Sequence, residues 1–159
     1  MTLPSAGIIR GPGEGEFIPR DRPILVKASG AETGGAYSLL ECTTPAGGWT
    51  TRHIHHTCEE AWYLLEGELT FQIGDRTDTY LSGTYVLVPR GVVHAFGNTG
   101  VAPAKSLRLF SPPGMERCFA EVAALAQASP TGNPEANVLE AILSRYGQEI
   151  VERGTSRPW

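Results

Sequence analysis

Three of the four histidines fall within a short pattern that could bind a metal ion. His53 and His55 are separated by a single residue, Glu60 follows shortly after them, and His94 lies further along the chain. Imidazole nitrogens and a carboxylate together are ligands typical of Fe, Mn, Ni, Cu and Zn. The pattern therefore predicts one site for a divalent transition metal, whose identity the ligand types leave open.

The predicted elements around these residues can bring them together. The first two histidines lie in a predicted strand over residues 49–55, where side chains alternate between faces, so both imidazoles point the same way. His56 points to the opposite face and is excluded as a ligand. Glu60 opens the neighbouring strand, and His94 follows a turn at residues 89–91. In a six-coordinate ion held by these four ligands, two positions stay open to water, substrate or dioxygen.

Composition limits the class of protein. The chain has 159 residues, enough for one domain with a hydrophobic core. A net charge of -4 without a basic stripe argues against nucleic acid as a partner. No apolar run is long enough to span a membrane, and the first residues lack the features of a secretory signal. The odd number and wide spacing of Cys42, Cys58 and Cys118 predict no disulfide framework, and we expect a cytoplasmic protein.

Most of the chain has the pattern of a β-sheet protein. The 19 glycines and 12 prolines punctuate short apolar runs, which follow one another at intervals of about ten residues, as in a β-sandwich or barrel. The predicted strands cover residues 23–27, 36–42, 49–55, 61–65, 69–73, 77–81, 85–88, 92–96 and 105–110, with a further short strand at 7–10.

Beyond residue 111 the apolar period becomes helical. One helix is predicted over residues 115–126, and a second begins with Asn133 as its N-cap and Pro134 at its first position. Gly147 ends the second helix, and residues 150–151 are expected to return to the sheet. The predicted organisation is an N-terminal arm over 1–20, a barrel over 21–111 and a helical extension over 112–159.

The residues around the predicted ligands resemble the two motifs of the cupin superfamily. The first block carries His53, His55, Glu60 and Gly67, and the second carries Gly83, Pro89, Gly91, His94 and Asn98. The longer stretch HIHHTCEEAWYLLEGELTF and the tail SPPGMERCFAE are similar to single-domain bacterial cupins described as quercetin-dioxygenase-like. The resemblance covers about residues 20 to 151. It implies an all-β double-stranded β-helix, or jelly-roll barrel, that binds its metal through His53, His55, Glu60 and His94 and forms a homodimer.

Several neighbouring residues have two interpretations each. Glu59 is an alternative to Glu60, but six residues separate Glu60 from Gly67 as in the cupin motif, so Glu60 is preferred. Asn98 is expected to be a turn residue rather than a ligand. Arg52 and Arg90 either hold an anionic substrate or are exposed loop charges, and the second interpretation is preferred. Aromatic side chains either line a substrate pocket or, as we expect for most, fill the barrel: Trp49, Trp62, Tyr63, Tyr85 and Phe96.

Three functions are compatible with this site. The first hypothesis is a mononuclear dioxygenase of quercetinase type, which acts on a small enolisable or aromatic substrate with Glu60 as the catalytic base. The second is a metal-dependent isomerase, cyclase, decarboxylase or lyase that uses no oxygen. The third is a non-enzymatic cupin that binds a small molecule. Residues 112–159 are too short, and lack the basic helix, for a DNA-binding domain.

Overall fold

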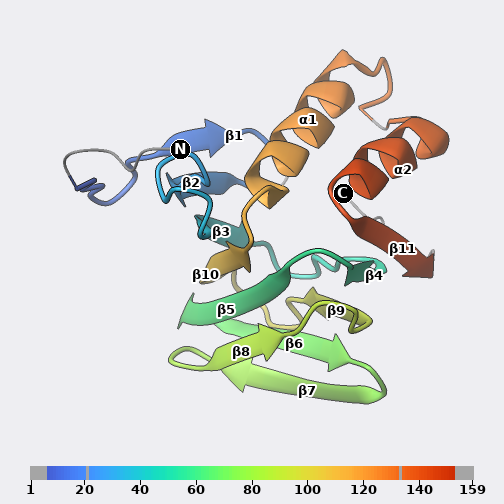
Figure 1. Ribbon diagram of the computed structural model, residues 1–159. Helices are drawn as coiled ribbons and strands as arrows, with labels where there is room; N and C mark the ends of the chain where they lie inside the picture. The colour runs from blue at the N-terminus through green and yellow to red at the C-terminus, as the bar shows by residue number, and fades with distance from the viewer. Residues whose placement is uncertain (1–6, 21, 133, 153–159) are drawn as a thin grey trace.

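The computed structural model describes residues 7–20, 22–132 and 134–152 (Figure 1). Within these residues the chain forms eleven strands and two helices. The strands are β1 Glu16–Ile18, β2 Ile24–Ala28, β3 Ser38–Thr44, β4 Arg52–His55, β5 Glu59–Glu66, β6 Glu68–Ile73, β7 Arg76–Leu81, β8 Tyr85–Val88, β9 His94–Gly97, β10 Ala104–Ser111 and β11 Gln148–Glu152. The helices are α1 Met115–Ala128 and α2 Ala136–Arg145.

The strands form two antiparallel sheets. The six-stranded sheet has the order β1-β2-β3-β10-β5-β8, and the five-stranded sheet has the order β11-β4-β9-β6-β7. Neighbours in each sheet come from distant parts of the chain, as in β10, which lies between β3 and β5. This arrangement confirms the predicted all-β jelly roll with two C-terminal helices.

The core follows from the alternation of side chains along the strands. In β3 and β10, every second residue is buried, so one face of each strand lies against the interior and the other faces outward. Trp62, Phe71 and Phe96 are central to the apolar cluster between the two sheets. A second cluster, which includes Phe110 and Leu143, packs the helices against the strands. Figure 1 shows both helices at one end of the molecule and β6, β7 and β8 at the other.

The C-terminal extension is part of the sheet. The chain leaves α2 and runs back along β4 as β11, with Gln148 opposite His55 and Ile150 opposite His53. The expected return of residues 150–151 to the sheet is therefore confirmed. Strand β4, which carries His53 and His55, is therefore paired on both edges, with β11 on one edge and β9 on the other.

Two local predictions need correction. Residues 7–10 form no strand; the first strand is β1, which pairs with β2. Residues 7–10 are held by a side chain rather than by strand pairing. The Arg10 guanidinium donates hydrogen bonds to the backbone oxygen of Lys27 and to the carboxylate of Glu32. Helix α2 begins at Ala136, so Pro134 precedes it; the predicted N-cap, Asn133, lies outside the described residues.

The expectation for the cysteines agrees with the structure. Cys42, Cys58 and Cys118 are free and buried, as the absence of a disulfide framework predicted. Burial, followed by the charge of Glu60, raises the pKa of Cys58 to about 12, which favours its role as a small packing residue over a reactive thiol. None of the helices in the described segments is long and apolar enough to cross a membrane.

Asn98 holds the loop between β9 and β10. It is fully buried, its Nδ2 donates to the backbone oxygens of Thr44 and Ala102 at 2.9 and 2.8 Å, and its Oδ1 accepts from the backbone of Gly100 at 2.9 Å. Asn98 is therefore a structural residue, as expected.

We predict that Asn98→Ala lowers the free energy of unfolding by about 2–4 kcal/mol, because it removes the hydrogen-bond partner of one buried and two partly buried backbone groups. Urea unfolding measures this loss. The control Asn137→Ala, at an exposed position of α2, should change the free energy by less than about 0.5 kcal/mol. Loss of bound metal without loss of stability in Asn98→Ala would contradict the structural role.

Candidate metal centre

The three predicted histidine ligands come from two adjacent strands. His53 and His55 lie on the inner face of β4, and His94 is the first residue of β9, directly opposite His53 in the register. All three side chains are at least 95% buried, and the ring centroids are 4.3 Å apart for His53 and His94 and 5.0 Å apart for His53 and His55. The alternation of side chains along β4 thus gathers the imidazoles as the sequence predicted.

Glu60 reaches the same point from the opposite sheet. It is the second residue of β5 and is fully buried. Its Oε2 lies 3.1 Å from Nε2 of His55 and 3.2 Å from Nε2 of His94. One donor atom from each of His53, His55, Glu60 and His94 lies within 4.8 Å of the others. The carboxylate therefore closes the donor set from across the barrel.

Backbone carbonyl groups fix the orientation of two imidazoles. Nδ1 of His53 donates to the oxygen of Thr51 at 2.8 Å, and Nδ1 of His94 donates to the oxygen of Val92 at 2.9 Å. In the neutral ring, the proton on Nδ1 leaves Nε2 with a lone pair. Metal-binding histidines commonly have this outer hydrogen bond, which sets both the tautomer and the direction of the ring.

The donor set fits a divalent cation. In neutral His94, the Nε2 lone pair faces a carboxylate oxygen of Glu60, and two acceptors at 3.2 Å need a positive charge between them. Burial, then the neighbouring His94 and His55, lowers the pKa of His53 to about 3, so that ring is neutral and able to bind metal. His53, His55, Glu60 and His94 could therefore hold one ion.

Arg108 is the partner of Glu60 on the side away from the histidines. It lies on β10, and its Nε donates to Oε1 of Glu60 at 2.9 Å; its Nη2 donates to the same oxygen. Burial alone would raise the pKa of Glu60, but the charge of Arg108 holds it well below its ordinary value. Glu60 is therefore an ionised and fully buried carboxylate.

The sequence reasoning missed Arg108, although a signal for it existed. Side chains alternate along β10, so Arg108 shares the inward face with Phe110 and Ser106. The guanidinium carbon lies 4.9 Å from the ring centre of Phe96 and 5.4 Å from that of Phe110. An arginine in the inward register of a core strand indicates a buried anionic partner, because an unpaired charge there is too costly.

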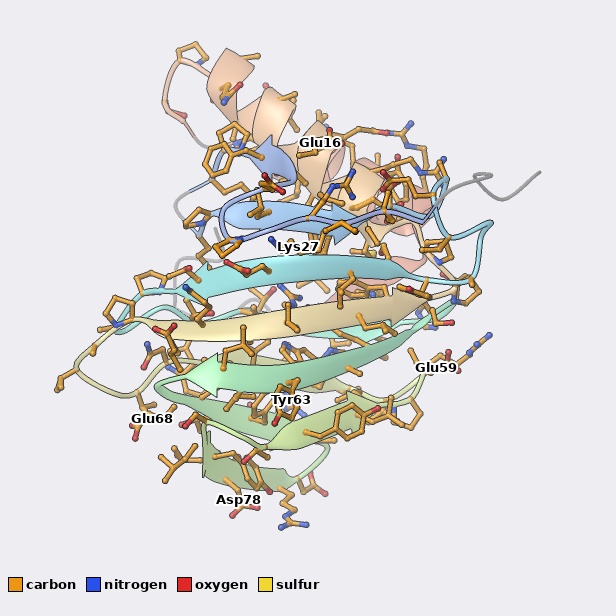
Figure 2. The ribbon with its side chains drawn as sticks, turned by 90° about the vertical axis from the view of Figure 1, so that its left-hand side faces the viewer. Glu16, Lys27, Glu59, Tyr63, Glu68 and Asp78 are labelled. Carbon is orange, nitrogen blue, oxygen red and sulfur yellow. The ribbon has the colours of Figure 1, made fainter. Side chains whose placement is uncertain are left out.

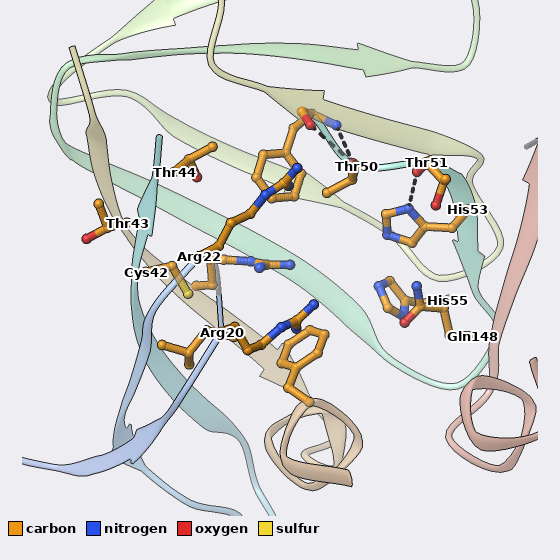
Figure 3. A pocket seen from close by; sticks show the side chains of 14 residues that line it. Arg20, Arg22, Cys42, Thr43, Thr44, Thr50, Thr51, His53, His55 and Gln148 are labelled. Atoms are coloured by element: carbon orange, nitrogen blue, oxygen red, sulfur yellow. Dashed lines mark hydrogen bonds between the residues drawn. The ribbon is translucent and has the colours of Figure 1, made fainter. Parts of the chain in front are cut away.

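A narrow cavity of about 40 Å³ opens beside the histidines (Figure 3). Its lining includes His53 and His55, several threonines of β3 and of the segment before β4, and three arginines: Arg20, Arg22 and Arg108. Gln148 of β11 also lines it and is missing from the sequence prediction. Only the pairing of β11 with β4 could place that residue beside His55.

Other candidate residues lie away from the centre. His56 is half exposed and its Nε2 lies 2.8 Å from a carboxylate oxygen of Glu149, which agrees with its exclusion. Glu59 points outward (Figure 2) and binds the Arg90 guanidinium through both oxygens, at 2.7 and 2.8 Å. Arg90 is thus an exposed charge, as expected. Arg52 is partly buried and donates to the backbone oxygen of Gly74, away from the donor set.

The aromatic residues divide between the core and the surface. Trp62 and Phe96 are buried in the barrel, as expected, and Phe96 also lines the cavity. The expectation is wrong for Tyr63 and Tyr85, which are 46% and 62% exposed on the outer face of the six-stranded sheet (Figure 2 for Tyr63). Side chains alternate along β5, so the inward position of Glu60 also places Trp62 inward and Tyr63 outward, a signal that the sequence prediction did not use.

Part of this chain is similar to known cupins. Residues 40–110, which contain all four candidate ligands, match the family model described as the cupin domain. An uncharacterized protein of Methanocaldococcus jannaschii is 32% identical over 80 residues, which cover 50% of this chain and 64% of that protein. The chain thus spans less than two thirds of this relative's length.

Solved structures show the same fold at low sequence identity. KdgF from Halomonas sp. has a TM-score of 0.61 and 14% identity, with coverage of 70% of this chain and 99% of that chain. A predicted oxalate decarboxylase from Thermotoga maritima has a TM-score of 0.54 and 22% identity, with coverage of 57% and 80%. The barrel therefore has the double-stranded β-helix fold of cupins, and the quercetin-dioxygenase resemblance receives no support beyond that fold.

We predict that His94→Ala and Glu60→Gln each reduce bound metal, measured by elemental analysis, to a small fraction of the wild-type content, because each removes a buried donor. The matched controls His56→Ala and Glu59→Gln should keep the wild-type content. A ligand assignment with Glu59 in place of Glu60 would reverse the result of the two glutamate variants.

We also predict that Arg108→Met destabilises the metal-free protein by about 3–5 kcal/mol, because the buried Glu60 carboxylate loses its cationic partner. Added metal should reduce this cost, since it supplies positive charge at the same carboxylate. Urea unfolding with metal and with a chelator measures both values. Arg90→Met, which breaks an exposed pair, should change the stability far less than Arg108→Met in either condition; an equal cost for the two variants would refute the buried pairing.

Proposed function

We propose that this chain, a cupin-fold barrel with a three-histidine and one-carboxylate centre, is a metal-dependent enzyme that acts on a small enolisable substrate. The observation that carries the proposal is the convergence of His53, His55, Glu60 and His94 beside a cavity that His53 and His55 line, with two imidazoles oriented by backbone carbonyls. A site that served only to stabilise the fold would not need an adjoining cavity lined by polar side chains.

The centre supports activation of a carbonyl or hydroxyl oxygen of the substrate. A bound divalent metal would act there as a Lewis acid, which acidifies the hydrogen next to a carbonyl group. Glu60 is proposed as the base that receives this proton. Its Oε2 faces the histidines and its Oε1 accepts from Arg108, so Arg108 controls how readily the carboxylate can accept a proton. The rings of Phe96 and Phe110 pack against the guanidinium group of Arg108.

The size of the cavity favours a small substrate. The cavity of about 40 Å³ is small beside the pockets of roughly 300–1,000 Å³ that hold drug-sized ligands. It has room for one functional group of a substrate beside the metal. A flavonol with three rings is far larger, so we favour small oxygen-bearing compounds over quercetin-like substrates.

Dioxygenation and non-oxidative chemistry share this activation step. In dioxygenation, the activated substrate reacts with dioxygen, as the first hypothesis from the sequence proposed. In non-oxidative chemistry, the proton returns to a different atom of the substrate, as in an isomerase, or a group leaves the substrate, as in a lyase. The second candidate is favoured by the same narrow cavity, because proton transfer needs no room for a second reactant.

The proposed enzyme works as a cytoplasmic homodimer without nucleic acid or membrane partners. Exposed apolar side chains on the outer faces of β5 and β8 support the dimer, because an apolar patch on a sheet face commonly marks an interface. They are Tyr63, Leu65, Tyr85 and Leu87. The three free, buried cysteines are compatible with the proposed compartment.

We predict that the metal-loaded protein catalyses exchange of carbon-bound hydrogen for deuterium in pyruvate or dihydroxyacetone under argon, measured by proton NMR. His94→Ala should lose the exchange and His56→Ala should keep it. Oxygen uptake measured in air with the same compounds and with quercetin distinguishes the dioxygenase from the non-oxidative enzyme. Absence of both exchange and oxygen uptake would contradict an enzymatic role and leave a binding protein.

A further inference from the structure

The cavity beside the metal centre has an unusual balance of charge. Of the described residues that line it, three are arginines and none is a carboxylate: Arg20, Arg22 and Arg108 carry the positive charge. Arg108 is balanced by Glu60, which lies behind it at the metal centre. A bound divalent ion would add further positive charge at the inner end. Guanidinium groups that reach such a space can bind an anion through their N–H groups.

The two remaining arginines lie where they could hold the far end of a metal-bound molecule. Figure 3 shows the Arg20 and Arg22 side chains reaching into the cavity from the side opposite His53 and His55. Each is held in place: the guanidinium carbon of Arg20 lies 5.2 Å from the ring centre of Phe119, and Nη2 of Arg22 donates to the backbone oxygen of Trp49. Positioned guanidinium groups are well suited to bind carboxylate or phosphate oxygens.

Gln148 supplies an independent sign of a ligand. Its side chain lines the cavity, the residue is 95% buried, and its Oε1 has no hydrogen-bond partner. A buried carbonyl oxygen without a donor is costly, so such atoms usually have a partner in the functional complex. An acceptor at this position calls for a hydroxyl or amine hydrogen on the bound molecule.

From these contacts we propose that the substrate of this centre is a small hydroxylated oxyanion. Its carboxylate or phosphate group binds Arg20 and Arg22, and a hydroxyl group donates to Oε1 of Gln148. That the bound molecule is a substrate rests on the proposed function. The anion site itself is inferred from Arg20, Arg22 and Gln148 alone. The narrow cavity limits the group that enters it to about the size of a carboxylate with one neighbouring hydroxyl.

Four probes separate the contributions. Titration calorimetry of the protein as purified, with its metal content measured, is carried out with glycolate, acetate, glycolamide and inorganic phosphate. Glycolate should bind at least about tenfold more tightly than glycolamide, which lacks the charge, and more tightly than acetate, which lacks the hydroxyl group. Tighter binding of phosphate than of glycolate also supports the oxyanion site and identifies phosphate as the preferred group.

Variants assign the site to its residues. Arg20→Gln and Arg22→Gln should each weaken glycolate about tenfold without changing metal content, and Arg22→Lys should retain most of the affinity because it keeps the charge. Gln148→Leu should remove the preference for glycolate over acetate and leave acetate binding unchanged. Arg90→Gln is the matched control, an exposed arginine away from the cavity, and should bind glycolate like the wild type.

The outcomes separate this inference from the proposed function. Equal binding of glycolate and glycolamide, or glycolate affinity unchanged in both Arg20→Gln and Arg22→Gln, would overturn the anion site even if the protein binds metal and turns over a neutral substrate. Conversely, arginine-dependent glycolate binding by a protein that shows no turnover would support the anion site and contradict the enzyme. Thermal unfolding of each variant verifies that a lost affinity is not a lost fold.

Discussion

The carboxylate of Glu60 imposes the strictest constraint on this structure. It is fully buried between two sheets, and an ionised carboxylate in such a place must be matched by positive charge or strong donors. Arg108 satisfies Oε1 from the neighbouring strand, while Oε2 faces the imidazoles of His55 and His94 across the barrel. The position of this single group therefore links the two sheets, the aromatic core around Arg108 and the candidate metal centre.

The geometry of the histidines, by contrast, is a local property of their strands. The carbonyls that orient His53 and His94 each belong to the residue two positions earlier, so the strand conformation itself directs the rings. Such short-range hydrogen bonds need no distant partner to form. They explain how a barrel of modest size can hold metal-binding nitrogens in a fixed direction.

The segments that flank the barrel complete the cavity. Arg20 and Arg22 come from the chain before β2, and Gln148 comes from β11, which follows the two helices. The barrel strands thus supply the metal ligands, whereas both flanking segments supply the charge and the hydrogen-bond acceptor that face a bound molecule. Substitutions in the flanking segments could therefore change which molecule binds in the cavity while the metal-binding side chains stay the same.

The sequence by itself determined the jelly-roll class and the four candidate ligands, because strand alternation and motif spacing act over short distances in the chain. It also indicated the return of the C-terminal residues to the sheet. Only the tertiary structure decided that Arg108 is the partner of Glu60, 48 positions away, and that Gln148 stands beside His55. These pairs depend on the register between strands from distant segments, which the periodicity of each strand alone cannot specify.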